Sequence, residues 1–267
     1  MKLLYSRNPN PRLAVAVARQ VRAAVEFEFA APLAPGQAER YRPLNPCLRL
    51  PILVLPGGGS LWEADAIACR LSRAAGSTFW RTGDAEPAMI QWISWGKENF
   101  VRACDMVQFE YVTKQRYGLG AVDPAKVDEG LEKFAGSAAL LEAELARRPW
   151  LLDGEISYAD FRMASFLPHH EIAGLPLQAY PAIANWYATI EALDAWRDPF
   201  AGLDAPELPP VPGHQSGRPD SSEAYASQRP SGEMAGAAWI PGRTIRGFGE
   251  SSCIPAPFRV TGTIHKS

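Results

Sequence analysis

Two carboxylates follow closely on a proline and a run of glycines in the stretch NPCLRLPILVLPGGGSLWEADAI, residues 45–67. Pro51 opens an apolar, β-prone run. Because proline cannot donate a hydrogen bond to a sheet, it marks the first residue, an edge or a bulge of a strand. Glu63 and Asp65 come after a glycine-rich turn, at the predicted start of a helix, where the helix dipole stabilises negative charge. The stretch therefore predicts a strand opened by Pro51 and a helix that begins beside Glu63.

Cysteine and histidine, common ligands of metal ions, show no metal-binding spacing in this chain. The cysteines form no C-x-x-C pair, and the histidine pair stands at a predicted helix end, where a cationic ring suits the dipole. We therefore expect no metal, and thiols that stay reduced in a reducing compartment. The residues concerned are Cys47, Cys69, Cys104, Cys253, His169, His170, His214 and His265.

The composition is that of a globular protein. The 267 residues are 47% hydrophobic and 10% aromatic, and the net charge of −2 provides no basic surface for nucleic acid or anionic membranes. No stretch reaches the roughly 18 apolar residues of a membrane span, and the N-terminus MKLLYSRNPNP lacks the apolar region of a signal peptide. We expect a soluble, cytoplasmic protein with no nucleic-acid or membrane partner.

Strand and helix patterns alternate in the first part of the chain, and helical patterns alone follow. Period-2 and period-3.6 spacings predict strands at 2–6, 25–29 and 52–55, and helices after Pro11, at 64–75, 85–117 and 124–148. The turn after residue 55 leaves room for a brief further strand before the helix at 64. We therefore expect an α/β domain at 1–78 and an all-helical domain at 84–205. Residues 206–267 are rich in Pro, Ser and Gly, which predicts a disordered tail, with 211–267 outside the folded unit.

The stretch LLDGEISYADFRMAS carries a capping box in the helical part. Ser157 is the predicted N-cap and Asp160 stands three residues later, while Ile156 and Phe161 are placed to form a hydrophobic staple. A capping contact of this kind contributes on the order of 1 kcal/mol to stability. Asp160 is therefore interpreted as a folding residue rather than a catalytic one.

Three motifs, in this order, resemble those of the glutathione transferase superfamily. NPCLRLPIL is similar to the family's Asn-Pro-x-Gly-Lys-Val-Pro-x-Leu, LWEADAI to its Glu-Ser-x-Ala-Ile, and LLDGEISYADF to its helix-capping motif. The resemblance covers residues 1–203 and implies an α/β thioredoxin-like N-terminal domain followed by an all-α C-terminal domain. It also implies a homodimeric detoxification enzyme that conjugates the thiolate of glutathione, its co-substrate, to a small apolar electrophile.

The same resemblance implies a glutathione site. Pro51 would follow a cis peptide bond that lets the backbone of Leu50 pair with the cysteinyl residue of glutathione, as an added strand does. Glu63 would bind the γ-glutamyl amino group, and the helix N-terminus at Ala64 the γ-glutamyl carboxylate. Arg49 would bind the glycine carboxylate. The family's serine is replaced by Ala64, so one hydroxyl donor is missing.

The thiolate also needs a hydrogen-bond donor, which in this family lies between the first strand and the first helix. In YSRNPNPR the matching position is Asn8, whose amide can donate to sulfur. Ser6 and Tyr5 are the fallback donors, and Asn10 is a further one that we place with the glutathione-binding residues. The reading of Asn8 as a plain turn residue beside Pro9 stays open.

Two other functions compete with conjugation. The segment WISWGKENF is similar to the related domain of the elongation factor one gamma subunit, which implies a non-catalytic protein-interaction module. A glutathione-dependent reductase is disfavoured, since Cys47 lies outside the activating loop.

Aromatic residues of the first long helix are expected to be divided between the core, a dimer interface and the electrophile cavity; they are Trp92, Trp95, Phe100, Phe109 and Tyr111.

Overall fold

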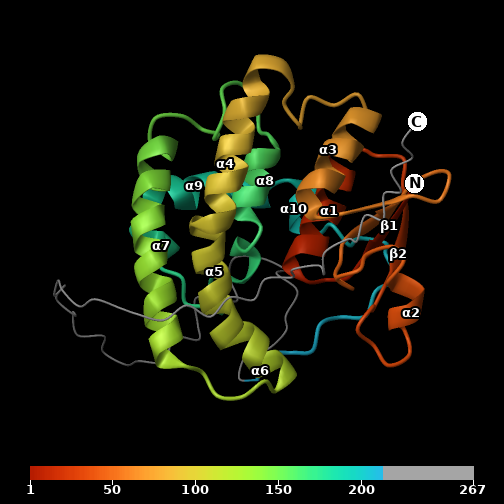
Figure 1. Cartoon of the computed structure of the whole chain (residues 1–267). Helices are drawn as coiled ribbons and strands as arrows, with labels where there is room; N and C mark the ends of the chain where they lie inside the picture. Colours follow the sequence, from red (N-terminus) through yellow and green to blue (C-terminus); the bar gives the residue numbers. More distant parts are fainter. Residues whose placement is uncertain (213–267) are drawn as a thin grey trace, which may run out of the picture. The chain divides into compact units, whose positions relative to one another are not determined.

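The computed structural model describes residues 1–212, and its first part is a mixed four-stranded sheet (Figure 1). The strands are β1 (Lys2–Tyr5), β2 (Glu26–Phe29), β3 (Ile52–Val54) and β4 (Ser60–Trp62), in the order β2-β1-β3-β4. β1 and β2 run parallel, whereas β3 is antiparallel to both of its neighbours. A parallel pair requires a crossover connection, which the helix between β1 and β2 provides.

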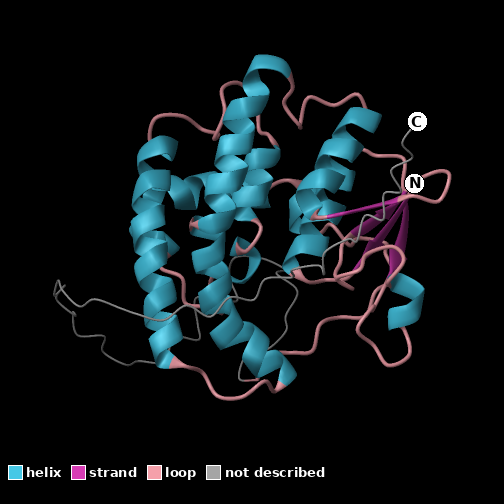
Figure 2. Ribbon diagram, in the orientation of Figure 1, coloured by secondary structure: helices cyan, strands magenta, loops and turns pink. Residues whose placement is uncertain are grey.

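Helices pack on both faces of the sheet. Helices α1 (Pro9–Gln20) and α3 (Ala64–Ala74) share one core with Leu3 and Leu53. Figure 2 shows these two helices on the side of the sheet that faces the other helices. On the opposite face, the single turn α2 (Ala38–Tyr41) brings Tyr41 into a smaller cluster with Leu4 and Ile52. This turn was not predicted, because one helical turn is too short to show a period.

The rest of the described chain is helical. The helices are α4 (Glu86–Glu98), α5 (Phe100–Gln108), α6 (Lys114–Tyr117), α7 (Pro124–Leu145), α8 (Tyr158–Ala164), α9 (Pro181–Glu191) and α10 (Asp194–Arg197), with a π-helical turn at Phe109–Thr113. No strand follows β4 within residues 1–212. The predicted fold class, an α/β domain followed by an all-α domain, is confirmed.

The helix predicted over 85–117 is interrupted at Asn99. This residue has φ −118° and ψ −89°, and it separates α4 from α5. Its side-chain amide donates to the carbonyl of Trp95 at 2.7 Å, and its backbone N–H donates to the same carbonyl. Asparagine side chains compete in this way with the regular helical pattern.

The predicted capping box is confirmed at the start of α8. Asp160 is fully buried and accepts hydrogen bonds from the backbone N–H of Ser157 at 2.9 Å and of Leu151 at 2.9 Å. The indole N–H of Trp186 donates to the same carboxylate at 3.1 Å. Asp160 therefore ties α8 to the preceding loop and to α9.

The chain returns to the α/β part after α10. Glu207 lies 2.9 Å from the guanidinium of Arg7, and Val211 is 5% exposed within the main core. The folded unit therefore extends at least to Val211, beyond residue 206, where the tail was predicted to begin. Residues 213–267 of the predicted tail lie outside the described residues. Within residues 1–212, no helix combines the length and the apolar character that crossing a membrane requires.

Candidate functional site

One end of the sheet brings the predicted glutathione-binding segments side by side. Leu4 pairs with Ile52 across β1 and β3, and Ile52 pairs with Trp62 across β3 and β4. Ser6 after β1, the Leu50-Pro51 step before β3 and Glu63 after β4 therefore lie at this same end. Neighbouring strands are about 4.8 Å apart, so the three segments fall within the reach of one small peptide.

The loop that leads into β3 is organised by a buried asparagine. Asn45 is 2% exposed, donates to the carbonyl of Arg49 at 2.8 Å and accepts from the N–H of Cys47 at 3.0 Å. The peptide bond between Leu50 and Pro51 is cis, as the resemblance implies. Arg49, in the same loop, is exposed to solvent. Asn45 belongs to the motif NPCLRLPIL, but no role was predicted for it, since a small polar residue before Pro46 was its only signal.

Glu63 adopts an unusual backbone conformation at the start of α3. Its φ of 73° and ψ of 127° lie in a region that residues with a Cβ rarely adopt. Its side chain is exposed and does not cap the helix, whereas the next residue, Ala64, is buried. Strained backbone of this kind is concentrated at ligand-binding positions. The carboxylate of Glu63 is thus presented to solvent beside the free N–H groups of a helix N-terminus.

The predicted activating residues form a pair at the start of α1. The side-chain amide of Asn8 donates to the hydroxyl oxygen of Ser6 at 3.3 Å. Asn8 is exposed at the N-cap position of α1, and Ser6 is 9% exposed. Since the hydroxyl accepts from Asn8, its own O–H is left to donate outward. Two helix N-termini, those of α1 and α3, therefore stand near the same end of the sheet.

Tyr5, the other fallback donor, lies in the core. Its ring stacks on Phe200 at 5.8 Å and meets Phe27 and Phe29 edge to face. Tyr5 is 1% exposed, and this burial raises the pKa of its hydroxyl. The structure therefore separates Tyr5 from the Ser6–Asn8 pair, because successive residues of an extended segment, such as Tyr5 and Ser6, point to opposite sides.

Asn10 and Asp65 face the helical part of the chain. The guanidinium of Arg162 donates to Asn10 Oδ1 at 2.6 Å and lies 3.3 Å from Asp65 Oδ1. Asp65 also accepts from the Tyr158 hydroxyl at 2.6 Å and from Lys97 at 3.0 Å. Burial acts to raise the pKa of Asp65, but Arg162, Tyr158 and Lys97 outweigh it, so that this pKa lies below its ordinary value.

This cluster changes the role expected of Asn10. The oxygen of its amide is already occupied by Arg162, which leaves the amide nitrogen for any ligand. Lys97, Tyr158 and Arg162 were not singled out from the sequence, because they lie between 32 and 97 residues away from Asp65 and no local pattern links them to it. The cluster fastens the start of α3 to α4 and α8.

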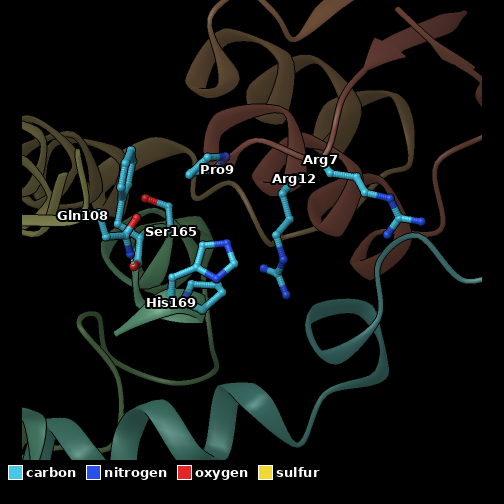
Figure 3. Close-up of a pocket in the computed structure, with 8 residues that line it drawn as sticks. Arg7, Pro9, Arg12, Gln108, Ser165 and His169 are labelled. Atoms are coloured by element: carbon cyan, nitrogen blue, oxygen red, sulfur yellow. Dashed lines mark hydrogen bonds between the residues drawn. The ribbon is translucent and has the colours of Figure 1, made fainter. Parts of the chain in front are cut away.

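A small pocket lies between the start of α1 and the segment after α8 (Figure 3). Polar and basic side chains make up most of its lining. The lining residues are Arg7, Pro9, Arg12, Gln108, Ser165, Phe166, Pro168 and His169.

The aromatic residues that were expected to be divided between the core, a dimer interface and the electrophile cavity lie outside this pocket. Phe100 is fully buried in the core, and Trp92 and Trp95 contact each other edge to face at 5.6 Å. Phe109 and Tyr111 are exposed on the π-helical turn that follows α5. None of the five lines the small pocket.

Comparison of the sequence with known proteins finds relatives of one kind. The family described as "Glutathione S-transferase, C-terminal domain" matches residues 103–194. The chain is 26% identical over 198 residues to "Glutathione S-transferase-like protein LUC7" of Fusarium sp, covering 70% of this chain and 88% of the relative. It is 27% identical over 139 residues to "Glutathione S-transferase GstB" of Escherichia coli, covering 51% of this chain and 65% of that protein.

Solved structures share the fold. A glutathione S-transferase-I bound with lactoylglutathione matches with a TM-score of 0.68 at 21% identity, covering 75% of this chain and 98% of the other. A glutathione S-transferase III in the apo form matches with a TM-score of 0.66 at 26% identity, covering 78% and 99%. The matches extend over both the sheet and the helices.

Proposed function

Since the chain belongs to the glutathione S-transferase superfamily, we propose that it binds glutathione at the end of its sheet and transfers the thiolate to a small electrophile. The observation that carries this proposal is the meeting of three segments there: Ser6 to Asn8, Arg49 to Pro51, and Glu63 to Ala64. Each segment supplies a group that matches one part of the tripeptide. The electrophile is expected to be small, because the pocket beside Pro9 is small.

The backbone and charged groups of the site suit the three residues of glutathione. Within residues 1–212, the backbone of Leu50 takes part in no loop or turn hydrogen bond, so that its N–H and C=O can pair with the cysteinyl residue. The carboxylate of Glu63 accepts from the γ-glutamyl ammonium, while the N–H groups at the start of α3 receive the γ-glutamyl carboxylate. Arg49 binds the glycine carboxylate.

The Ser6–Asn8 pair stabilises the thiolate. Asn8 orients the Ser6 hydroxyl, which donates to the sulfur, and the N-terminus of α1 adds a favourable field. The thiolate then attacks the electrophilic carbon. A sulfur–carbon bond forms as the bond to the leaving group breaks, and the leaving group departs with the electron pair. No protein group changes its covalent state.

The decisive experiment measures the thiol pKa of bound glutathione. Calorimetric titration first establishes binding, and thiolate absorbance against pH then gives the pKa. We expect a value below that of free glutathione. Ser6→Ala and Asn8→Ala should each raise this pKa and slow conjugation of a generic aryl halide, with little change in affinity for S-methylglutathione, which has no thiolate to stabilise.

Tyr5→Phe is the matched control, since it removes a hydroxyl that the structure places in the core. It should leave the thiol pKa unchanged. A full effect in Tyr5→Phe, with none in Ser6→Ala or Asn8→Ala, would contradict the proposed donor pair.

Two departures favour a second function, that of a non-catalytic partner-binding module. Asparagine rather than Tyr, Ser or Cys stands at position 8, and Ala64 replaces the serine of the family motif. In this case glutathione would bind, if at all, with its solution thiol pKa, and the sheet end would serve as a docking surface. The same titration therefore distinguishes the two functions.

We also propose that the chain forms a homodimer. Trp62, on the edge strand β4, is 40% exposed, and Ile90 on α4 is 47% exposed. An edge strand and large exposed apolar side chains each favour burial against another chain. Light scattering should give twice the mass of one chain, and Trp62→Glu should reduce it to that of a monomer.

A further inference from the structure

The chain after α9 runs along α1 and is fastened to it by arginine side chains. Figure 1 shows α10 beside α1, and these two helices are in contact. Three arginines of the N-terminal part donate to backbone carbonyls of residues 196–205, which we call the strap. The bonds run from Arg12 to the carbonyl of Trp196, from Arg19 to those of Pro199 and Ala201, and from Arg7 to that of Ala205. The strap is therefore attached to both ends of α1 and to the loop before it.

Phe200 of the strap contacts the side chains on either side of Ser6. Its ring stacks on that of Tyr5 with the centroids 5.8 Å apart, and the Arg7 guanidinium lies 4.8 Å from its centroid. Phe200 is 7% exposed, so its own position is fixed by the core. Successive side chains of an extended segment point to opposite sides, so Ser6 is turned away from this ring and toward Asn8, whose amide donates to it at 3.3 Å. One side of the loop is thus held by the strap, while the other carries the proposed donor pair.

Arg7 is largely buried although its partners satisfy it incompletely. Its side chain is 19% exposed, and its Nη2 lies 3.3 Å from the carbonyl oxygen of Ala205 and 2.9 Å from the carboxylate of Glu207. Its Nε is buried and has no hydrogen-bond partner among residues 1–212. Figure 3 shows the side chain directed away from Ser165 and His169. Burying an incompletely satisfied cation costs free energy, so a gain in stability does not explain this arrangement, whereas the fixing of one loop conformation does.

We propose that Phe200 is a positioning residue for thiolate stabilisation: it holds Tyr5 and Arg7 so that the Ser6 hydroxyl points at the glutathione sulfur. The proposal deepens the proposed function and rests on it for the thiolate. Phe200 acts through the loop and forms no bond with a reacting atom. Hydrogen bonds weaken steeply as the donor turns away from the acceptor, so a loop that is held less firmly stabilises the thiolate less.

The test is Phe200→Leu in the full chain, because leucine keeps apolar volume in the core but has no flat ring face. Every charge near the site is unchanged, so a change in the thiol pKa reports the position of the donor rather than a lost cation. We expect the thiol pKa of bound glutathione to rise and kcat for a generic aryl halide to fall about five- to tenfold, with affinity for S-methylglutathione within about twofold of the unmodified chain. Phe200→Tyr, which keeps the ring, should leave all three values near those of the unmodified chain.

Two further comparisons separate positioning from general damage to the core. Phe134→Leu is the matched control, because Phe134 is fully buried and packs in the helical part against Phe100 and Tyr180. It should lower the free energy of unfolding but leave the thiol pKa unchanged. In a Ser6→Ala background, Phe200→Leu should raise the thiol pKa no further, since the donor that it positions is gone.

Arg7→Lys is the second variant if Phe200→Leu does not fold. Lysine keeps the charge but lacks the flat guanidinium that stacks on the ring, so a smaller rise of the thiol pKa is expected. An unchanged thiol pKa in the variants that fold would overturn the proposal. So would an equal rise in Phe134→Leu, or an equal rise with and without the Ser6 hydroxyl.

A measurement without glutathione separates this proposal from the proposed function. NMR order parameters of the backbone amides of residues 6–8 should fall in Phe200→Leu and stay unchanged in Phe134→Leu. If glutathione bound to the unmodified chain keeps its solution thiol pKa, the proposed function fails, and the order parameters still decide whether Phe200 holds the loop. Order parameters that do not change in Phe200→Leu would refute its positioning role, whatever the result with glutathione.

Discussion

Glu63 combines an exposed carboxylate with a backbone conformation that favours glycine, so ligand binding and stability should oppose each other at this residue. Strain at such a position costs about 1–3 kcal/mol, and glycine, which relieves it, loses about 0.5–1 kcal/mol more chain entropy. We therefore predict that Glu63→Gly raises the free energy of unfolding by about 1 kcal/mol. The same change should weaken glutathione by about 1.5–3 kcal/mol, the range for hydrogen bonds to charged groups.

Arg22→Gly is a suitable control, since Arg22 also has a positive φ, of 50°, but lies after α1, outside the site. It should stabilise the protein without changing glutathione affinity. Chemical unfolding and calorimetric titration measure the two effects. A loss of stability in Glu63→Gly would show that the side chain contributes more to folding than its conformation costs.

The pKa of His169, lowered to about 4, predicts a dependence of stability on pH. Above pH 6.5, the ordinary pKa of histidine, the ring is neutral in both the folded and the unfolded chain. Between 6.5 and about 4 the unfolded chain binds a proton that the folded chain does not, so the free energy of unfolding falls as the pH falls, by up to roughly 3 kcal/mol from this residue. His169→Gln should reduce this loss between pH 7 and pH 4.5, and an NMR titration of the ring that gives an ordinary pKa would refute the argument.

Residue-level prediction was successful where a sequence motif identifies the partners and failed where only the folded conformation brings them together. Ser157 and Asp160 were assigned correctly, because a capping box is read from residues three positions apart. Asp65 was predicted only as an acidic residue in the first turn of a helix, yet it bonds Tyr158, 93 residues away. Only the folded chain brings such groups together. Asn45 was missed since its bonds depend on the loop conformation rather than on a pattern.

Among the elements, α5 and α7 are held close by Gly130. A Cβ at this glycine would lie 2.8 Å from Val107 Cγ2 and 3.2 Å from Met106 Cβ, so the helices would have to move apart. Gly136 on the same helix has no atom within 4 Å of its would-be Cβ. We predict that Gly130→Ala lowers the free energy of unfolding by about 1–3 kcal/mol through overpacking. Gly136→Ala should raise the free energy of unfolding by up to about 1 kcal/mol, because alanine has the higher helix propensity. Denaturant unfolding should therefore show stability changes of opposite sign for the two variants. Changes of the same sign would exclude the close helix contact at Gly130 as the cause.

Periodicity predicted long elements well and short or interrupted ones poorly. The apolar positions of α4 and α5, such as Met89, Ile93 and Phe100, continue one helical spacing across Asn99, so the spacing alone could not show the break. β4 has three residues and α2 four, which is too few to define a period. The order of elements was nevertheless correct, because turns and glycines separate them.

For the whole molecule, the main core joins the α/β part to the helices and to the segment after α10. Tyr5 stacks on Phe200, Arg12 on Trp196, and Arg7 reaches both Ala205 and Glu207. Composition marked this last segment as tail, because its prolines and small residues have no period. Composition could not show that a single valine, Val211, is buried in the core.

The contribution of this segment can be isolated with two shortened chains, one ending at residue 205 and one at residue 212. Burial of a valine side chain is worth about 1.5–3 kcal/mol, whereas the ion pair between Arg7 and Glu207 is worth little, because the Glu207 side chain is 79% exposed. We therefore predict that the chain ending at 205 unfolds with a free energy about 2 kcal/mol lower than the chain ending at 212. In the longer chain Val211→Ala should account for most of this difference and Glu207→Gln for less than about 0.5 kcal/mol. Equal stability of the two chains in denaturant unfolding would mean that the contact made by Val211 does not hold the segment to the core in solution.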